Sequence, residues 1–303
     1  MSRATDRLSL LATFVRIAEA GSISAAARDL GLSQPSVSRQ LASLEKRLQT
    51  QLARRTTHEL ALTEAGRLLL ADARALLDAW EVLEERHLKA ATELRGRLKV
   101  VAPIALGQHA LAGFAAGFRL EYPRITLTWQ LEDRAIRFAE VGCDCWVKVG
   151  PVPDDTLIVR RLGRVERLLV AAPGLLGTQR IEHPRDLAQV AAVALTPFEG
   201  DALPLTSDEG EHALLRPPVA MSTNNIFALH SAARAGVGMA VLPKWFVQQD
   251  LEAGRLHDVL PAWRAPSLDV NVAYAPGRHR PQRLRVFVDA LLAAVQSIPG
   301  IEA

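Results

Sequence analysis

A stretch near the N-terminus, residues 22–55, constrains the fold most, because it places helix-starting and helix-ending residues at short intervals. Ser24 is expected to cap a short helix through its hydroxyl, and Gly31 to end it, since the residue after a helix often needs a positive φ. Ser33 can cap the next helix, and Pro35 fits its first turn, where no N–H is needed. The pattern therefore predicts a helix-turn-helix.

The second predicted helix has an apolar and a polar face. Its apolar residues recur every three or four positions and are expected to point inward: Val37, Leu41, Leu44 and Leu48. The opposite face holds mostly small polar side chains: Gln34, Ser36, Ser38, Arg39, Gln40 and Ser43. In the DNA major groove, Gln pairs with adenine and Arg with guanine, while Ser bonds to bases or phosphates. The face predicts a DNA-reading helix; the alternative is a solvated polar face.

The segments on either side extend this prediction. Apolar side chains share one face of an earlier helix: Leu8, Leu11, Phe14, Val15 and Ala18. After the motif, Arg54 and Arg55 precede an alternation of Leu60 and Leu62, which favours a β-hairpin, or wing. A wing lays its arginines along the DNA backbone or minor groove, whereas the alternative is a solvated loop. Residues 1–67 hold ten Lys or Arg and six Asp or Glu, a net charge of +4, while the net charge of the whole chain is +3. The positive charge is therefore concentrated in the predicted DNA-reading unit, as attraction to phosphates would favour.

A long helix is predicted from Glu64 to Leu94, with Thr63 as its cap. Apolar positions repeat every seven residues, in one series of Leu69, Leu76, Leu83 and Ala90 and another of Ala73, Trp80, His87 and Leu94. A lone helix cannot bury such a seam, so the seam implies pairing with a second copy of the chain. Two DNA-reading units on a two-fold axis match a palindromic operator.

Length and composition bound the remaining possibilities. A chain of 303 residues suggests two or three domains, and 49% hydrophobic with 23% charged residues is ordinary for a globular protein. No stretch approaches the roughly 20 apolar residues that span a bilayer, and the N-terminus lacks the apolar core of a secretory signal. Cys143 and Cys145 offer no disulfide framework; buried packing is expected, and a thiol sensor or metal site is the alternative. These features predict a cytoplasmic protein with no membrane partner.

From Arg95 the pattern changes to strands that alternate with helices. Strands are predicted at residues 98–102, 125–131, 143–149, 168–173, 190–195, 212–223, 238–243 and 268–276. Helices are predicted after the first strand, around Ile136, and at residues 184–189, 226–235 and 244–252. A last helix carries an apolar stripe of Leu284, Phe287, Leu291 and Val295. The basic run from Arg278 to Arg285 is expected to be a solvated helix start. This order argues for an α/β fold with a mostly parallel sheet covered on both faces.

One run of residues, together with the order of the segments, resembles a known family. The run FVRIAEAGSISAAARDLGLSQPSVSRQLASLEKRL, followed by LTEAG, resembles the winged helix-turn-helix of LysR-type transcriptional regulators. The resemblance covers essentially the whole chain. This sequence departs from the family pattern at Gln49, where the family usually has Gly, and at Ala53, where it usually has Phe.

The resemblance implies an α/β protein with an all-α-type winged helix-turn-helix at residues 1–62 and a dimerisation linker helix at 63–94. A two-lobed effector domain, like a periplasmic binding protein, follows at 95–303. Lobe I would hold residues 95–163 and 269–299, and lobe II residues 164–268. By the same resemblance DNA is contacted by Ser33, Gln34, Pro35, Ser36, Ser38, Arg39, Arg54 and Arg55. The implied assembly is a homodimer through the linker helix and then a homotetramer, with RNA polymerase as a candidate partner.

A small-molecule effector is expected between the lobes, and no metal or other cofactor is predicted. Ligands in open α/β sheets bind at the carboxyl ends of strands. The predicted effector residues at these ends are Ile104, Ala105, Thr196, Phe198, Thr223 and Asn224. Many relatives have Ser or Thr where this chain has Ile104 and Ala105, which weakens a simple anion site. Free N–H groups of the helix that starts near Asn225 can still receive an anionic or carbonyl group. The alternative for each residue is an ordinary cap or turn.

Two other functional classes stay open. A ligand-blind repressor or architectural protein would use the α/β part for oligomerisation alone. An enzyme with a DNA-binding appendage is disfavoured, because no G-x-S-x-G, H-E-x-x-H, G-x-x-x-x-G-K or G-x-G-x-x-G motif occurs and the eight histidines are dispersed. The sequence therefore favours a regulator that is not an enzyme.

Overall fold

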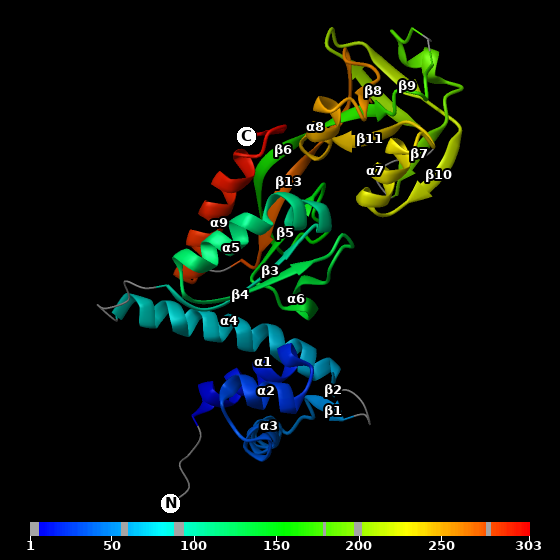
Figure 1. The fold of residues 1–303 in the computed structure, drawn as a ribbon. Helices are drawn as coiled ribbons and strands as arrows, with labels where there is room; N and C mark the ends of the chain where they lie inside the picture. The colour runs from blue at the N-terminus through cyan, green and yellow to red at the C-terminus, as the bar shows by residue number, and fades with distance from the viewer. Residues whose placement is uncertain (1–5, 56–59, 88–93, 178–179, 197–201, 277–279) are drawn as a thin grey trace, which may run out of the picture.

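The computed structural model describes residues 6–55, 60–87, 94–177, 180–196, 202–276 and 280–303. Three parts follow one another along the molecule in Figure 1. A small helical unit with a β-hairpin lies at one end, and the long helix α4 (Glu64–His87) separates it from a first α/β lobe. A second α/β lobe lies at the other end, joined through the long strands β6 (Ile158–Ala171) and β13 (Trp263–Tyr274).

The N-terminal unit is a helix-turn-helix followed by a hairpin, as predicted. Its elements are α1 (Arg7–Ala20), α2 (Ile23–Leu30), α3 (Gln34–Leu48), β1 (Ala53–Arg55) and β2 (Leu60–Leu62). Gly31 ends α2 with a φ of 64°, and Ser33 caps α3, so both predictions are confirmed. The prediction that Ser24 caps α2 is wrong. The Oγ of Ser22 accepts the hydrogen bond from the N–H of Ala25 at 3.1 Å, because the helix starts earlier than predicted.

The buried faces of α1 and α3 form the core of this unit. Three of the predicted inward residues of α3 are buried: Val37, Leu41 and Leu44. The fourth, Leu48, is 44% exposed, because it is the last residue of the helix and lies beyond the core. The buried residues of α1 are Leu10, Thr13, Phe14, Val15 and Ile17. The predicted face of α1 is thus shifted around the helix: Leu8, Leu11 and Ala18 are only half-buried.

Helix α4 has one buried face and one exposed apolar face. The Oγ1 of Thr63 accepts a hydrogen bond from the N–H of Gly66 at 3.0 Å, so Thr63 caps the helix as predicted. The buried residues include Leu70, Ala73 and Val82. Four large side chains are exposed and form the apolar α4 face: Leu68 at 64%, Leu76 at 50%, Trp80 at 44% and Leu83 at 48%. This face has no partner within the described part of the protomer.

The predicted heptad seam of α4 needs two corrections. Leu69 and Ala73 pack on the core of the N-terminal unit instead of lying in the seam, because α4 lies against α1 there. The described part of the helix runs to His87, and Leu94 is not helical but half-buried and packed on the core of the first lobe. Ala90 and the side chain of His87 lie outside the described residues. Leu76, Trp80 and Leu83 remain from the predicted seam.

Lobe I is built on three parallel strands. These are β3 (Arg95–Ala102), β4 (Arg124–Leu131) and β5 (Cys145–Val149). The helical segments are η1 (Leu106–Ala110), α5 (Ala112–Glu121), α6 (Phe138–Val141) and α9 (Gln282–Gln296). The predicted apolar stripe of α9 is confirmed, since Leu284, Phe287, Leu291 and Val295 are all buried in the largest apolar cluster of this lobe. A short last strand, β14 (Ile301–Glu302), pairs with β6.

The basic run at the start of α9 is not uniformly solvated. Arg285 is exposed, as predicted. Arg283 is only 7% exposed, so the prediction of a solvated position is wrong for this residue. The reason lies far away in the sequence, because carboxylates of α4 surround the Arg283 guanidinium. Arg278 and His279 lie outside the described residues.

Lobe II holds the remaining elements. Its strands are β7 (Ala192–Leu195), β8 (Leu203–Ser207), β9 (His212–Leu215), β10 (Val219–Thr223), β11 (Ala240–Pro243) and β12 (His257–Asp258). Its helical segments are η2 (Pro184–Leu187), α7 (Ile226–Arg234) and α8 (Lys244–Glu252). The single strand predicted at 212–223 is two strands, because Pro217 and Pro218 have no N–H for a sheet. Every helix among the described residues is too short or too polar to cross a membrane.

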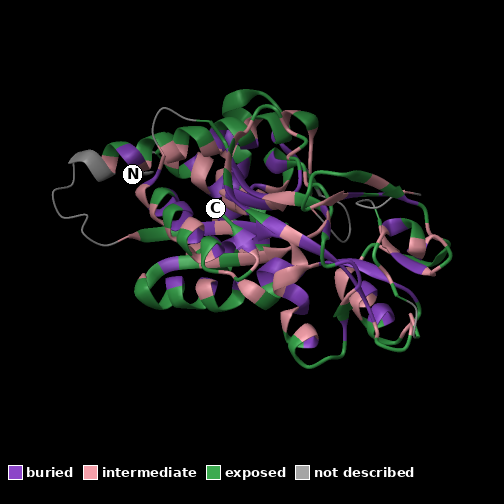
Figure 2. Cartoon of the chain, turned by 90° about the horizontal axis from the view of Figure 1, so that it is seen from above, coloured by how far each residue is buried: buried purple, intermediate pink, exposed green. Residues whose placement is uncertain are grey.

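The antiparallel strands β6 and β13 run through both lobes. They pair from Ala265 to Tyr274 of β13, with two irregularities in the register. In lobe I β13 also pairs with β5, and in lobe II β6 also pairs with β11. The sheet is therefore mixed and not mostly parallel, because the chain enters and leaves lobe II on neighbouring antiparallel strands. Figure 2 shows the buried residues concentrated along these strands and on the inner faces of the helices.

Candidate nucleic-acid interface and effector site

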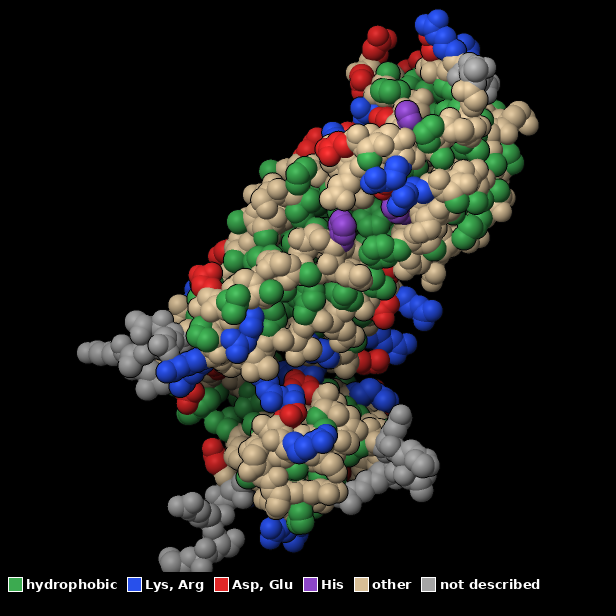
Figure 3. Space-filling view, viewed as in Figure 1, with side chains coloured by type: hydrophobic (Ala, Val, Ile, Leu, Met, Phe, Trp, Pro, Cys, Tyr) green, Lys and Arg blue, Asp and Glu red, His purple; other side chains and the backbone are tan. Residues whose placement is uncertain are grey.

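Helix α3 lies at the end of the molecule away from lobe II (Figure 1), where Figure 3 shows basic side chains. Ser33 caps the helix, and its Oγ accepts a hydrogen bond from the N–H of Ser36 at 3.4 Å. The predicted reading residues of α3 divide by exposure: Ser33, Gln34, Pro35 and Arg39 are exposed, and Ser36 and Ser38 are half-buried. These six residues, the polar α3 edge, therefore form an accessible surface at the start of the helix, whereas Val37 between them is buried.

The side chains of Arg39 and Gln40 are held by contacts within the protein. The Nε of Arg39 donates to the carbonyl of Pro35, one turn earlier, at 3.3 Å. Gln40 points inward, where its Oε1 accepts a hydrogen bond from the Oγ1 of Thr13 at 2.5 Å. The prediction that Gln40 belongs to the polar face is therefore wrong, because this residue ties α3 to α1.

The hairpin exposes Arg54. Arg54 pairs with Ala61 and Arg55 with Leu60 in an antiparallel register. Ala53 is buried, and successive residues of a strand point to opposite faces, so Arg54 points away from the core. The side chain of Arg55 and residues 56–59 lie outside what the structure describes.

Glu45 and Gly66 position the wing, and neither is in the predicted site. The Oε1 of Glu45 accepts hydrogen bonds from the N–H groups of Leu52 at 2.8 Å and Ala53 at 3.2 Å, which fixes the chain between α3 and β1. A Cβ at position 66 would overlap the carbonyl of Leu52, so glycine lets the first turn of α4 lie against this segment. The sequence could have pointed to both residues, because Glu45 follows the apolar run of α3 and Gly66 ends the LTEAG run.

The strand ends of lobe II bring Thr196 and Thr223 together. Strands β7 and β10 are parallel, and the carbonyl of Thr223 accepts hydrogen bonds from the N–H of Thr196 at 2.8 Å and from its Oγ1 at 3.3 Å. Asn224 follows and is exposed. From lobe I, Ala105 is buried in an apolar cluster with residues of β7, α7 and α8, so the loop after β3 reaches this region. Phe198 lies outside the described residues.

Several N–H groups at this site already have acceptors. Ile104 donates its N–H to the Oδ1 of Asp133 at 2.9 Å. The Oδ1 of Asn225 accepts from the N–H groups of Phe227 at 3.0 Å and Ala228 at 3.2 Å. The prediction of free N–H groups at the start of α7 is therefore wrong for Phe227 and Ala228, because Asn225 caps the helix itself.

Aromatic rings join the two lobes beside this site. The ring centroid of His109, on η1, lies 5.6 Å from that of Phe246 and 6.1 Å from that of Trp245, both on α8. Phe227 packs edge-on against Phe246 from α7, with centroids 5.2 Å apart. A change in the angle between the lobes must therefore slide or separate the His109 ring and the rings of Trp245 and Phe246.

Asp133 and Lys148 bring charge to the carboxyl ends of β4 and β5, and neither is in the predicted site. Burial lowers the pKa of Lys148, and the carboxylate of Asp133 opposes this shift. Both residues lie at the strand ends where ligands of open sheets bind. In the sequence, both residues could have been found as charged residues at the end of a mostly apolar strand.

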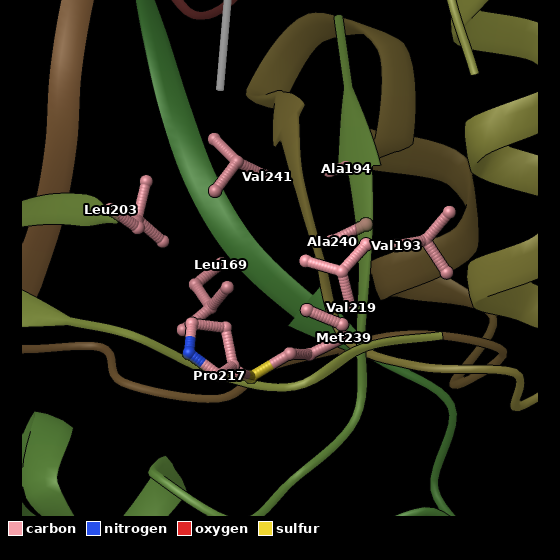
Figure 4. A pocket seen from close by; sticks show the side chains of 10 residues that line it. Leu169, Val193, Ala194, Leu203, Pro217, Val219, Met239, Ala240 and Val241 are labelled. Atoms are coloured by element: carbon pink, nitrogen blue, oxygen red, sulfur yellow. The ribbon is translucent and has the colours of Figure 1, made fainter. Parts of the chain in front are cut away.

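An apolar pocket lies inside lobe II (Figure 4). Its wall comes from β6, β7, β10 and β11 and includes Leu169, Val193, Val219, Met239 and Val241. The cavity volume of about 30 Å³ is close to that of one water molecule in the liquid. This pocket is therefore too small for a metabolite, whose sites usually span hundreds of cubic ångströms.

Both cysteines are free and buried, which fits the interpretation of packed side chains. Burial raises the pKa of Cys143 to about 12 and raises the pKa of Cys145 well above its ordinary value. Reactive thiols need the opposite shift, because the thiolate is the nucleophile. Among the described residues, three or more His, Cys, Asp or Glu side chains do not gather as metal ligands would.

Two family models match this chain. Residues 8–67 match "Bacterial regulatory helix-turn-helix protein, lysR family", and residues 91–296 match "LysR substrate binding domain". The chain belongs to the LysR family. It is therefore a DNA-binding transcriptional regulator, and both the predicted family and the predicted fold class are confirmed.

Relatives of this LysR-type regulator match along nearly its whole length. It is 30% identical over 299 residues to the HTH-type transcriptional regulator PtxR of Pseudomonas aeruginosa, covering 96% of this chain and 95% of that protein. It is 29% identical over 287 residues to the HTH-type transcriptional activator AaeR of Escherichia coli, covering 94% and 93%. These relatives are transcriptional regulators and not enzymes.

Solved structures match the same length. The full-length virulence activator AphB of Vibrio cholerae, a member of the LTTR protein family, gives a TM-score of 0.58 at 25% identity and covers 95% of this chain and 99% of its own. CrgA of Neisseria meningitidis, a LysR-type transcriptional regulator, gives 0.58 at 27% identity, covering 94% and 97%. LysG of Corynebacterium glutamicum with bound effector Arg gives 0.61 at 20% identity, covering 95% and 98%, which shows the shared fold.

Proposed function

We propose that the polar α3 edge of this LysR-type regulator reads base edges in the major groove of an operator. The observation that carries this proposal is that Gln34, Pro35 and Arg39 are exposed while Val37, Leu41 and Leu44, on the other side of α3, are buried. Gln34 and Arg39 have the side chains that pair with adenine and guanine. Ser33, Pro35, Ser36 and Ser38 are small, so they let the helix approach the base edges closely.

The wing holds the DNA backbone beside this edge. Arg54 is exposed on β1, and Arg55 follows it in the same strand. Contacts of arginine to phosphate fix the register of a protein on the duplex without reading sequence. Glu45 and Gly66 act behind the wing, because they fix the chain on either side of the hairpin.

Two copies of the chain pair through the apolar α4 face and bind an interrupted palindrome. Leu68, Leu76, Trp80 and Leu83 leave exposed apolar side chains on one helix, which costs free energy in water until a second surface covers them. Pairing about a two-fold axis sets two α3 helices at a fixed separation on one side of the DNA. Contacts between effector domains then join two dimers into a tetramer.

A small-molecule effector binds between the lobes and changes the angle between them. The predicted residues Thr196, Thr223 and Asn224 lie at the strand ends of lobe II, and Ile104 and Ala105 lie in the helical segment after β3 of lobe I. Strands β6 and β13 act as the hinge, and the rings of η1 and α8 make the contact that a new angle changes. An effector that binds the protein more tightly at one lobe angle shifts the population toward that conformation.

The chain uses no metal or other cofactor. It works in the cytoplasm and recruits or excludes RNA polymerase.

The experiment that tests DNA reading starts from duplexes selected by the purified protein from a random library. The selected duplexes should share two inverted half-sites with a gap. Arg39→Ala should weaken binding by about 1–3 kcal/mol in an anisotropy titration and relax selection at one base pair in each half-site. Arg119→Ala, an exposed arginine on α5, is the matched control and should bind as the wild type does. Equal affinity of Arg39→Ala and wild type removes Arg39 from the interface.

A ligand-blind regulator is the second candidate function, and one observation favours it. The N–H groups of Ile104, Phe227 and Ala228, which an effector carboxylate or carbonyl would use, already donate to Asp133 and Asn225. A thermal-shift screen of small metabolites separates the two candidates. A compound that raises the melting temperature and changes operator affinity supports the effector-responsive form, whereas DNA binding that no compound alters supports the ligand-blind form.

A further inference from the structure

Arg283 is a buried arginine that joins lobe I to α4. Its Nε donates to the carbonyl of Arg97, on β3, at 2.7 Å. One terminal nitrogen lies 3.5 Å from the Oδ1 of Asp78 and 3.8 Å from the Oδ1 of Asp144, and the other pairs with the carboxylate of Glu81. Asp78 and Glu81 belong to α4, whereas Arg97, Asp144 and Arg283 belong to lobe I. This contact bridges more than 200 residues of sequence.

The chemistry of this site points to a contact that forms only when the two parts meet. A guanidinium stays out of water at a large desolvation cost unless carboxylates and carbonyls surround it. The side chain of Arg283 is 8% exposed, whereas those of Asp78 and Glu81 are 45% and 32% exposed. If α4 moved away, Arg283 would keep only Asp144 and the carbonyl of Arg97, while water would hydrate the α4 carboxylates.

Arg74 makes a second bridge one turn earlier on α4. One of its terminal nitrogens donates to the carbonyl of Ala139, on α6, at 3.1 Å, and the other lies 3.4 Å from the Oε1 of Glu19, on α1. Its guanidinium also fills the space where a Cβ of residue 142 would lie, and Gly142 ends α6 with a φ of +60°. Arg74 therefore links α1, α4 and lobe I.

The same boundary contains a repulsion. Burial lowers the pKa of Arg16, on α1, and the positive charge of Arg97 lowers it further. Two like charges across a contact make separation easier, so the closeness of the two parts depends on the attractive pairs around them. Figure 3 shows acidic and basic side chains gathered where the N-terminal unit meets lobe I. The boundary is thus a balanced charged contact and not an apolar core.

We propose that Arg283 is a positioning residue which, by pairing with Glu81 of α4, fixes the angle of the DNA-reading unit to lobe I. This inference rests on the proposed function, because the angle matters only if the unit reads DNA. Lobe I carries α9 and one end of each hinge strand, so a change in lobe angle reaches α4 through this contact. Breaking the pair leaves each α3 able to bind a half-site but no longer sets the separation between two of them.

The first test measures the angle directly and needs neither DNA nor effector. Spin labels are placed on Cys residues introduced by Ser9→Cys on α1 and Ala135→Cys on lobe I, both exposed positions. Cys143 and Cys145 are buried and stay unlabelled. Labelled protein is diluted into unlabelled protein, so only distances within one protomer are recorded by double electron–electron resonance. The wild type should give one narrow distance distribution, and Arg283→Gln a broader one.

Matched variants separate positioning from folding. Arg285→Gln removes the same charge from an exposed position of α9 and should leave the distribution narrow. Glu81→Gln removes the pair from the α4 side, so it should broaden the distribution even if Arg283→Gln perturbs lobe I. Arg283→Lys should restore part of the narrow population. A distribution for Arg283→Gln and Glu81→Gln as narrow as in the wild type overturns the proposal.

The second test asks whether the angle matters for DNA. The selected operator is compared with duplexes whose half-sites are one or two base pairs closer or farther apart. The wild type should prefer the selected spacing by on the order of tenfold, and Arg283→Gln by about twofold, with equal affinity of both for a single half-site. Retained spacing preference in Arg283→Gln sinks the positioning role. Loss of wild-type DNA binding would instead sink the proposed function and leave the distance result standing.

Discussion

Gln49 shows at the scale of one residue how this chain departs from its family. Among the described residues it is the non-glycine residue with a positive φ, 51°, and it ends α3 with its N–H donating to the carbonyl of Glu45. Left-handed backbone costs an L-residue about 1–2 kcal/mol, whereas glycine adopts it freely. The family glycine at this position therefore has a physical cause that the chain has given up.

Gln49→Gly should stabilise the end of α3. The strain is relieved, but glycine loses more chain entropy on folding, so the net gain is about 1 kcal/mol or less. Hydrogen exchange of the amide protons of α3 measures local opening and should slow accordingly. Gly31→Ala, at a φ of 64° after α2, is the opposite change and should speed exchange of α2. Faster exchange of α3 in Gln49→Gly would show that the Gln side chain compensates for its strain.

Helix-capping residues could be predicted from the sequence, whereas the burial of an arginine could not. Gly31, Ser33 and Thr63 were predictable, because a cap is decided by backbone groups two or three residues away. The cap of α2 was predicted at Ser24 and lies at Ser22, because both serines can act as caps at that helix start. The burial of Arg283 was not predictable, because its partners on α4 lie far away in the sequence.

Strands β6 and β13 show the same limit at the scale of elements. The sequence predicted only the apolar end of β6, because the rest of the strand carries Arg160, Arg161 and Arg164. Period-two patterns reveal a strand with one solvated face, but charges on a strand that links two lobes obscure the pattern. The effector site could not be predicted fully for a similar reason. Asp133 and Lys148 become candidate site residues only because the fold brings their strand ends together.

Acidification should tighten the contact between α4 and lobe I. Burial at the contact raises the pKa of Asp78 from 3.8 to about 6; Arg283 and, less strongly, Arg74 oppose this shift, while Asp144 and Glu81 add to it. Burial also raises the pKa of Asp144, which the N–H of Lys99 and Arg283 oppose. A carboxyl whose pKa is raised on docking favours the docked state below its free pKa and loses this advantage as pH rises through the docked pKa.

The pH window that follows lies between about 4 and 6 for Asp78. The spin-label distance distribution should therefore be narrower at pH 5.5 than at pH 7.5. Asp78→Asn, which imitates the protonated carboxyl, should stay narrow at both values and remove most of the dependence. A distribution that broadens as pH falls would mean that the lost pairing with Arg283 outweighs the desolvation of Asp78.

At the scale of the whole molecule, α4 is the element that contacts both the DNA-reading unit and lobe I. Its buried face packs on α1, its Asp78 and Glu81 pair with lobe I, and its apolar face is exposed. The three surfaces lie around one helix, so the proposed dimer axis, the reading unit and the effector domain cannot be oriented independently. The sequence predicted the pairing of α4, but the heptad pattern alone could not separate Ala73, which packs inward, from Trp80, which does not.

Trp80→Glu should break the dimer. A dimer about a two-fold axis contains the change twice, and each large apolar side chain contributes roughly 1.5–3 kcal/mol when buried, so the loss is roughly 3–6 kcal/mol. Sedimentation equilibrium should show monomers at micromolar concentration, and the affinity for the full palindrome should fall to that for one half-site. Leu120→Glu, at an 81% exposed position of α5, is the control and should leave the dimer intact. Dimers that persist in Trp80→Glu would place the two-fold axis on another surface, and the separation of the α3 helices would then follow from contacts between effector domains.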